Sequence, residues 1–178
     1  MKGSGETALI EIRELDAAAT RTCLTELADL LIDCVEGGAS LGFPSPLERH
    51  VAREYWMGVA DGVESGRSVL FVAGDLIAGT VQLHFAAFPN GRQRAEVAKL
   101  MVHSSARNHG LGTRLMEAVE QEAGRRGKTL LILDTQTGSG AEHLYRKLGW
   151  ESAGVIPDFA FTPAGQLAPT TFFFKRVT

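Results

Sequence analysis

Residues that form disulfides or bind metals are scarce in this sequence. Its two cysteines are Cys23 and Cys34, and it has no CxxC or HExxH motif and no paired His/Cys spacing. If both cysteines lie on one helix, they are about 16 Å apart, because a helix rises about 1.5 Å per residue. A disulfide needs a much shorter separation. We therefore expect two core thiols, no disulfide and no metal site.

The sequence also lacks an excess of one charge and lacks a long apolar run. A net charge of −3 predicts no general attraction to nucleic acid or to an anionic membrane. No stretch approaches the ~20 apolar residues that cross a bilayer. Residues 1–15 lack the apolar core of a signal peptide. These absences favour a cytoplasmic protein with neither a nucleic-acid nor a membrane partner.

What is present is the composition of an ordinary globular protein, with 44% hydrophobic and 22% charged residues. The length suits one domain over residues 1–178, and no repeat, low-complexity tract or linker divides it.

Alternation and helical spacing predict an α/β order of elements. Residues 129–135 are apolar at consecutive positions, which is typical of a central strand covered on both faces. A tight turn is expected at Gly74–Asp75, and a loop is expected over 157–169. The predicted strands are 8–15, 68–74, 76–88, 94–103, 129–135, 150–156 and 170–177, and the predicted helices are 16–36, 47–63, 110–127 and 140–149.

A polar turn with two glycines joins the strand at 94–103 to the helix that follows it. The start of a helix presents unpaired N–H groups and a partial positive charge, so such a turn suits phosphate or pyrophosphate. Arg107 and Arg114 bracket the turn and can add positive charge. Three kinds of phosphate-binding turn are then candidates.

Two of these turns fit poorly. A Walker A loop needs Gly-x-x-x-x-Gly-Lys-Ser/Thr, and no such string occurs. A Rossmann turn needs Gly-x-Gly-x-x-Gly, but Leu115 stands where its last glycine would be. Its strand would also have to end closer to Gly110 than Val102 does. Asp134, at the end of the next strand, matches a ribose-binding acid and keeps the dinucleotide alternative open.

The third turn is Arg107-x-x-Gly110-x-Gly112, after a strand ending in Leu-x-Val at 100–102. It resembles the Arg/Gln-x-x-Gly-x-Gly/Ala turn of the GNAT superfamily of N-acetyltransferases. "AEHLYRKLGW" at 141–150 resembles that family's Ala-x-x-Leu-Tyr-x-x-x-Gly-Phe segment.

The resemblance covers about residues 7–177, and within the superfamily it is closest to the bacterial tabtoxin-resistance type. "LDTQTGSGAEHLYRKLGW" and the tail from 153 to 175 carry this finer similarity. It implies a GNAT fold, an α/β domain with a mixed sheet of six to seven strands, about four flanking helices and a splay between the strands at 94–103 and 129–134.

The function that the resemblance implies is transfer of an acetyl group from acetyl-CoA to the amine of a small, amino-acid-like molecule, with toxin resistance as the physiological role. Family members are often dimers, so a homodimer is expected as well. Two alternatives are a protein N-terminal acetyltransferase and a non-catalytic module that binds acyl-CoA or a toxin.

The resemblance also implies which residues hold acetyl-CoA. The pantetheine arm pairs with the strand at 100–102 like an added strand, and the pyrophosphate lies on the turn. Many relatives carry Asn seven residues before the family tyrosine, where this chain has Gly138, and Ser139 is the candidate replacement. The expected contacts are Leu100, Met101, Val102, Arg107, Asn108, His109, Gly110, Leu111, Gly112, Thr113, Arg114 and Ser139.

Three residues are candidates for the chemistry. Glu96 and Asp134 would face the gap between their strands if these are adjacent and parallel, and Glu96 is favoured as the base that deprotonates the amine. The alternative is that Glu96 pairs with Arg94 or Lys99 on a solvated edge and that Asp134 forms a cap or turn. The resemblance makes Tyr145 the acid for the leaving thiolate, because a phenol pKa of ~10 exceeds a thiol pKa of ~8.5; the alternative is a core tyrosine.

Overall fold

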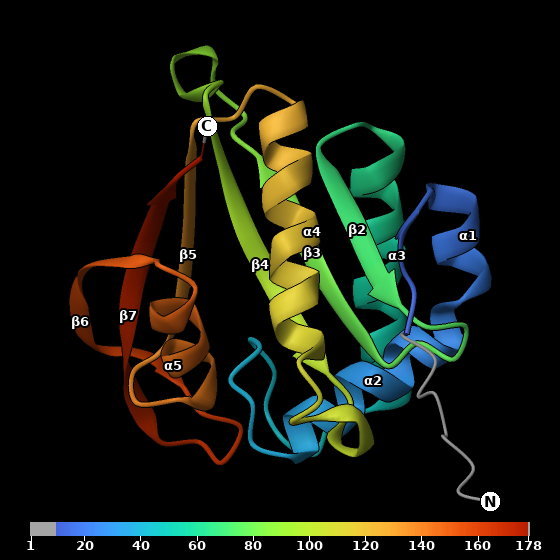
Figure 1. The fold of residues 1–178 in the computed structure, drawn as a ribbon. Coiled ribbons are helices and arrows are strands. Elements are labelled where there is room, and N and C mark those ends of the chain that lie inside the picture. Colours follow the sequence, from blue (N-terminus) through green and yellow to red (C-terminus); the bar gives the residue numbers. More distant parts are fainter. Residues whose placement is uncertain (1–9, 178) are drawn as a thin grey trace, which may run out of the picture.

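The computed structural model describes residues 10–177 and contains one seven-stranded sheet in the order β1-β2-β3-β4-β5-β7-β6 (Figure 1). All neighbours are antiparallel except β4 and β5, which run parallel. The first two residues of the strand expected at 8–15 lie outside the described residues. The strands are β1 (Ile12–Leu15), β2 (Ser68–Ala73), β3 (Gly79–Phe85), β4 (Arg94–Val102), β5 (Leu130–Gln136), β6 (Glu151–Phe161) and β7 (Leu167–Arg176).

The described residues form five α-helices, because the helix predicted over 16–36 is broken at Cys23, where the backbone has a ψ of 18°. Asp16 caps the first piece by accepting the Ala19 N–H at 2.7 Å. Within the same residues, no helix is long and apolar enough to cross a bilayer. The helices are α1 (Ala17–Thr22), α2 (Leu24–Glu36), α3 (Arg49–Glu64), α4 (Leu111–Arg125) and α5 (Gly140–Lys147).

Two apolar clusters hold the helices to the two faces of the sheet. Leu115 of α4 and Tyr145 of α5 belong to the cluster on one face, whereas Leu31 of α2 and Trp56 of α3 belong to the other. Figure 1 shows α4 in front of the sheet and α3 behind it. Every residue of β2 is buried, since alternate side chains enter the two clusters. This arrangement confirms the predicted α/β fold with a mixed sheet.

The loop predicted over 157–169 is wrong for most of its length, because β6 and β7 form one long hairpin that leaves only residues 162–166 as a loop. A register shift between Ile156 and Ala160 absorbs Pro157 and Asp158, and Asp158 takes a φ of 50°. Since β6 is an edge strand, an irregularity at a proline costs no pairing on its outer side.

The turn predicted at Gly74–Asp75 is longer than expected. Ala78 donates its N–H to the Ala73 carbonyl at 2.8 Å, so residues 74–77 all lie within the turn.

The feature that positions the site is a separation between β4 and β5. Their pairing stops after Glu96, which faces Ile132. One residue of β3, between Thr80 and Gln82, then faces two residues of β4, and Lys99 takes a φ of 54°. Such a bulge bends the strand that carries the extra residue. The splay predicted between these strands is thereby confirmed.

Candidate active site

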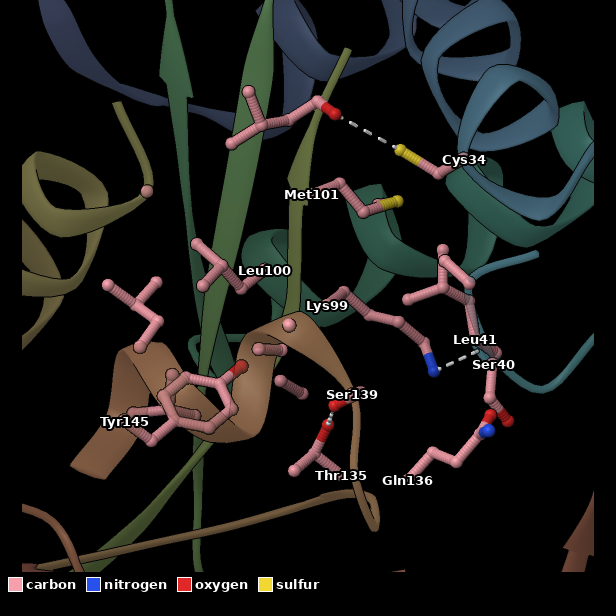
Figure 2. A pocket seen from close by; sticks show the side chains of 18 of the residues that line it. Cys34, Ser40, Leu41, Lys99, Leu100, Met101, Thr135, Gln136, Ser139 and Tyr145 are labelled. Carbon is pink, nitrogen blue, oxygen red and sulfur yellow. Dashed lines mark hydrogen bonds between the residues drawn. The ribbon is translucent and has the colours of Figure 1, made fainter. Parts of the chain in front are cut away.

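The splay opens into a cavity of about 990 Å³, part of which Figure 2 shows from close by. The turn at 106–113, the loop at 37–42, the ends of β4 and β5 and the start of α5 all contribute to its wall. Every site residue predicted from the sequence lines this cavity except His109 and Arg114.

One end of the cavity is the N-terminus of α4. Gly110 has a φ of 75°, a conformation that a residue with a Cβ adopts only at a cost. No side chain among the described residues caps this helix, and its Arg114 N–H bonds to the Gly110 carbonyl. The N–H groups of the first turn therefore point toward the cavity without a side-chain partner, as a phosphate site requires.

Gly112 has a different role from Gly110. A Cβ at Gly112 would lie 3.2 Å from Leu144 Cδ2 of α5, whereas a Cβ at Gly110 would meet nothing within 4 Å. Gly112 therefore allows α4 and α5 to approach, while Gly110 sets the backbone direction of the turn.

Arg107 is tied to the protein rather than extended toward the turn. Its Nε donates to the Val102 carbonyl at 3.0 Å, and the same carbonyl accepts the Cys34 thiol at 3.6 Å (Figure 2). Asp33 lies 4.0 Å from the Arg107 guanidinium. The Arg107 charge thus stays at the cavity wall, and its position is fixed from two elements.

The backbone of β4 offers free groups to the gap. His103 donates its N–H to Ala78 of the β3 side at 2.9 Å, and Met101 pairs with Thr80. Because N–H directions alternate along a strand, those of Leu100 and Val102 point away from β3, toward the splay. This is the edge on which the sequence predicted that pantetheine would pair.

Ser139 lies at the expected place, but its hydroxyl already has two protein partners. Its Oγ accepts the Glu142 N–H at 3.2 Å as the cap of α5, and it lies 3.2 Å from the Thr135 hydroxyl. A contact with pantetheine would have to share this hydroxyl, so the expected role of Ser139 stays a prediction.

Glu96 and Asp134 both line the cavity. Neither forms a salt bridge with any described residue, so Glu96 is not paired with Arg94 or Lys99. Both side chains are partly open to solvent at the splay, yet the protein atoms around them raise the pKa of each carboxyl, and for Glu96 the negative charge of Asp134 raises it further. Lys99 acts in the opposite direction on both groups. A carboxylate with a raised pKa is a better proton acceptor near neutral pH.

Tyr145 is buried, with 6% of its surface exposed, and it lines the cavity. Its ring packs against Trp150 and Phe173, with ring centres 6.1 Å away in each case. Burial, and then the charge of Asp134, raise the pKa of the hydroxyl. The hydroxyl has no hydrogen-bond partner among the described residues, and it is directed into the cavity (Figure 2). Tyr145 is therefore a core ring whose hydroxyl faces the cavity, and its expected role as the acid stays a prediction.

The sequence did not identify several residues of the cavity wall. Lys99 of β4 donates from Nζ to the Leu41 carbonyl at 2.9 Å, across 58 positions of sequence. Leu41 belongs to the loop at 37–42, which closes the cavity on the α2 side. Phe159 of β6 and Gln136 of β5 line it as well. A lysine between the apolar residues 97–98 and 100–102 of β4 was the one local sign of this wall.

Sequence comparison shows which family has this arrangement. The sequence pattern described as "Acetyltransferase (GNAT) family" matches residues 25–150, and the chain belongs to this family. It is an acetyl-CoA-dependent N-acetyltransferase, and the dinucleotide alternative is excluded. The uncapped α4 N-terminus and the open space at Gly110 fit the phosphates of this cofactor.

Individual relatives agree with this assignment. An uncharacterized N-acetyltransferase from the hisH-hisA intergenic region of Azospirillum brasilense is 34% identical over 131 residues, which is 71% of this chain and 76% of that protein.

Two acetyltransferases illustrate the solved structures that have the same fold. The ribosomal-protein-alanine N-acetyltransferase of Brucella melitensis has a TM-score of 0.77 at 23% identity, covering 94% of this chain and 100% of that one. The phosphinothricin acetyltransferase of Sinorhizobium meliloti, solved with acetyl-CoA, has a TM-score of 0.75 at 19% identity, covering 95% and 89%.

Proposed function

We propose that this enzyme acetylates the primary amine of a small, amino-acid-like molecule, with Glu96 as base, Asp134 as its partner and Tyr145 as acid. The observation that carries the proposal is the pair of carboxylates without salt bridges, Glu96 and Asp134, at the point where β4 and β5 separate. An amine enters as an ammonium, and a carboxylate beside the thioester is what removes its proton.

The residues divide the reaction between them. Acetyl-CoA supplies the acetyl group as a thioester. Glu96 takes a proton from the acceptor ammonium, and the amine then forms its bond to the acetyl carbon. The Leu100 N–H, which is directed into the splay, stabilises the negative charge that develops on the acetyl oxygen, and the Val102 N–H stays free to pair with pantetheine. Tyr145 donates its proton to the sulfur as the carbon–sulfur bond breaks, and the second proton that the new amide nitrogen loses returns to the Tyr145 oxygen.

A small acceptor fits the cavity better than a protein N-terminus. The hydrogen bond from Lys99 to Leu41 ties the loop at 37–42 to β4 at the end of the cavity that Lys99, Leu41 and Gln136 line, which we call the acceptor end. The resemblance of residues 133–150 to the tabtoxin-resistance type also supports an amino-acid-like acceptor and a role in toxin resistance. The solved phosphinothricin acetyltransferase supports the fold alone, since it is 19% identical.

The test is release of free CoA thiol from acetyl-CoA, with a panel of the standard amino acids, phosphinothricin, simple alkylamines and short peptides. We expect turnover with one or more amino acids and little with peptides. Turnover with peptides alone would favour the protein N-terminal alternative. Tight binding of CoA without turnover of any amine would favour the non-catalytic module.

Two further expectations remain proposals. A homodimer is supported by the edge strand β6, which exposes the apolar side chains Val155, Ile156 and Phe161. Sedimentation velocity measures the oligomeric state directly. The cytoplasmic location predicted from the sequence is tested by fractionation of the producing cell.

A further inference from the structure

Lys99 has a position that the chemistry above does not use. The bulge in β4 gives it a φ of 54° and directs its side chain to the acceptor end of the cavity (Figure 2). Its Nζ forms one hydrogen bond, to the Leu41 carbonyl at 2.9 Å, and no salt bridge with any described residue. An ammonium has three N–H donors, so two remain for another group.

Two neutral polar side chains line the same end. Ser40 comes from the loop at 37–42, and Gln136 comes from the end of β5. Figure 2 shows the Gln136 amide directed toward Ser40, and Ser40 precedes Leu41, whose carbonyl accepts the hydrogen bond from Lys99 Nζ. Neither side chain has a hydrogen-bond partner among the described residues. Together, Lys99, Ser40 and Gln136 form a corner of free donors, which we call the donor corner.

The charges around the cavity separate into two kinds. Glu96 and Asp134 are negative and suit the acceptor ammonium, whereas Lys99 is positive and would repel it. Burial lowers the pKa of Lys99, while Asp134 and Glu96 raise it. A half-buried cation without an ion-pair partner is destabilising, and an anionic ligand removes that destabilisation. An amine without an acid group can pair only with the two carboxylates. A molecule that carries both an ammonium and an anionic group can pair with the carboxylates and with Lys99.

We propose that the donor corner binds a carboxylate, or a similar oxyanion, on the same molecule as the acetylated amine. The acceptor is then an amino acid, bound with its ammonium at Glu96 and Asp134 and its acid group at Lys99 Nζ, Ser40 Oγ and the Gln136 amide. This inference rests on the proposed function and specifies how that site selects its substrate. Lys99 is a specificity residue that takes no proton in the reaction.

The experiment compares Lys99→Met with the unaltered enzyme on a matched pair of acceptors. The pair is the best amino acid of the panel and its carboxamide, which keeps the amine and loses the negative charge. Since the two amines differ in intrinsic reactivity, the measured quantity is the ratio of kcat/KM values, acid over amide, in each protein. Lys147→Met is the control, because it removes a positive charge from another part of the same cavity wall.

We expect Lys99→Met to lower the acid-over-amide ratio by about 10- to 100-fold, mainly through a higher KM for the acid. Lys99→Arg should restore much of the ratio, and Lys147→Met should keep it. Equal losses of kcat/KM for acid and amide would overturn the proposal. Lys99 would then only hold the loop at 37–42 against β4. No turnover of any amine by the unaltered enzyme would instead reject the proposed function.

A second measurement covers the case in which Lys99→Met folds poorly. Ser40→Ala and Gln136→Leu each remove one neutral donor and keep Lys99. Each should raise the KM of the acid about 10-fold more than that of the amide, because each removes a hydrogen bond to a charged group. Unchanged values in both variants would place the acid group elsewhere and contradict the donor corner.

Discussion

Glu96 is the last residue of β4 that pairs with β5, opposite Ile132. Asp134 lies two residues further along β5, where β4 no longer pairs with β5. The two carboxylates thus line one cavity from two strands that are hydrogen-bonded to each other up to Glu96 and separate beyond it. Their proximity to each other and to protein atoms raises the pKa of Glu96. A base with a raised pKa has consequences for both activity and stability.

Glu96→Gln should reduce kcat strongly. Loss of a general base costs about 10²- to 10⁴-fold, and we expect a smaller loss for Asp134→Asn if Asp134 mainly positions the ammonium. Steady-state thiol release at saturating amine measures both. The opposite order, with Asp134→Asn the more damaging change, would assign the base to Asp134.

The pH dependence of kcat tests the same assignment. The kcat should fall as the pH drops through the pKa of the base, which lies above the ordinary glutamate value of about 4.3. Glu96→Gln should remove this acidic limb.

The same substitution should stabilise the fold. The folded state raises the pKa of Glu96, so it holds the proton more tightly than the unfolded chain does. Stability is then lost as pH rises from about 4.3 through the folded-state pKa. At pH 7 Glu96→Gln should raise Tm only slightly, because solvent screens this exposed carboxylate, and the difference should vanish below about pH 4. Differential scanning calorimetry at the two pH values measures it. A lower Tm at pH 7 would show that the charge of Glu96 stabilises the protein, contrary to the raised pKa.

Tyr145→Phe should lower kcat by about 10- to 100-fold, because the leaving thiolate loses its proton donor. Its Tm should change little, since the hydroxyl has no hydrogen-bond partner among the described residues and the ring contacts with Trp150 and Phe173 remain. Steady-state kinetics and a melting curve report the two effects. Unchanged kcat would leave Tyr145 as a core tyrosine, the alternative that the sequence left open.

Gly110→Ala should weaken CoA binding, and Gly127→Ala provides its matched control. Both glycines have a positive φ, 75° and 68°, with no atom within 4 Å of an added Cβ. Each substitution should cost about 1–2 kcal/mol of stability, but only Gly110 lines the cavity. Titration calorimetry with CoA should therefore show a higher Kd for Gly110→Ala alone. Equal Kd values in both variants would argue against the turn as the phosphate site.

The residues that sequence reasoning identified belong to short local patterns. Gly110, Gly112 and the strand at 100–102 act through the conformation of the backbone. Their order and spacing in the sequence are enough to predict that conformation. Tyr145 follows from the pattern of one short helix. The splay was predictable only through the family resemblance, because no local pattern says where two strands stop pairing.

The residues that were missed depend on contacts between distant segments. Lys99 meets Leu41 across 58 positions, and nothing near either residue in sequence indicates the other. The break at Cys23 and the long β6–β7 hairpin were missed for a different reason. In the hairpin, the local preference of a proline-containing segment for a loop is weaker than its pairing with the sheet. At Cys23, the helix propensity of the segment is weaker than the separate packing of α1 and α2 against α3.

The uncapped first turn of α4 makes the stability of the folded protein depend on the concentration of its cofactor. A ligand that accepts these N–H groups completes the helix, and a ligand bound only by the folded state stabilises it by RT ln(1 + [L]/Kd). A hundredfold excess over Kd adds about 2.7 kcal/mol, a sizeable share of the stability of an ordinary domain. The half-life of the enzyme in a cell would then follow the acetyl-CoA level, so that the protein lasts longest when its acetyl donor is abundant.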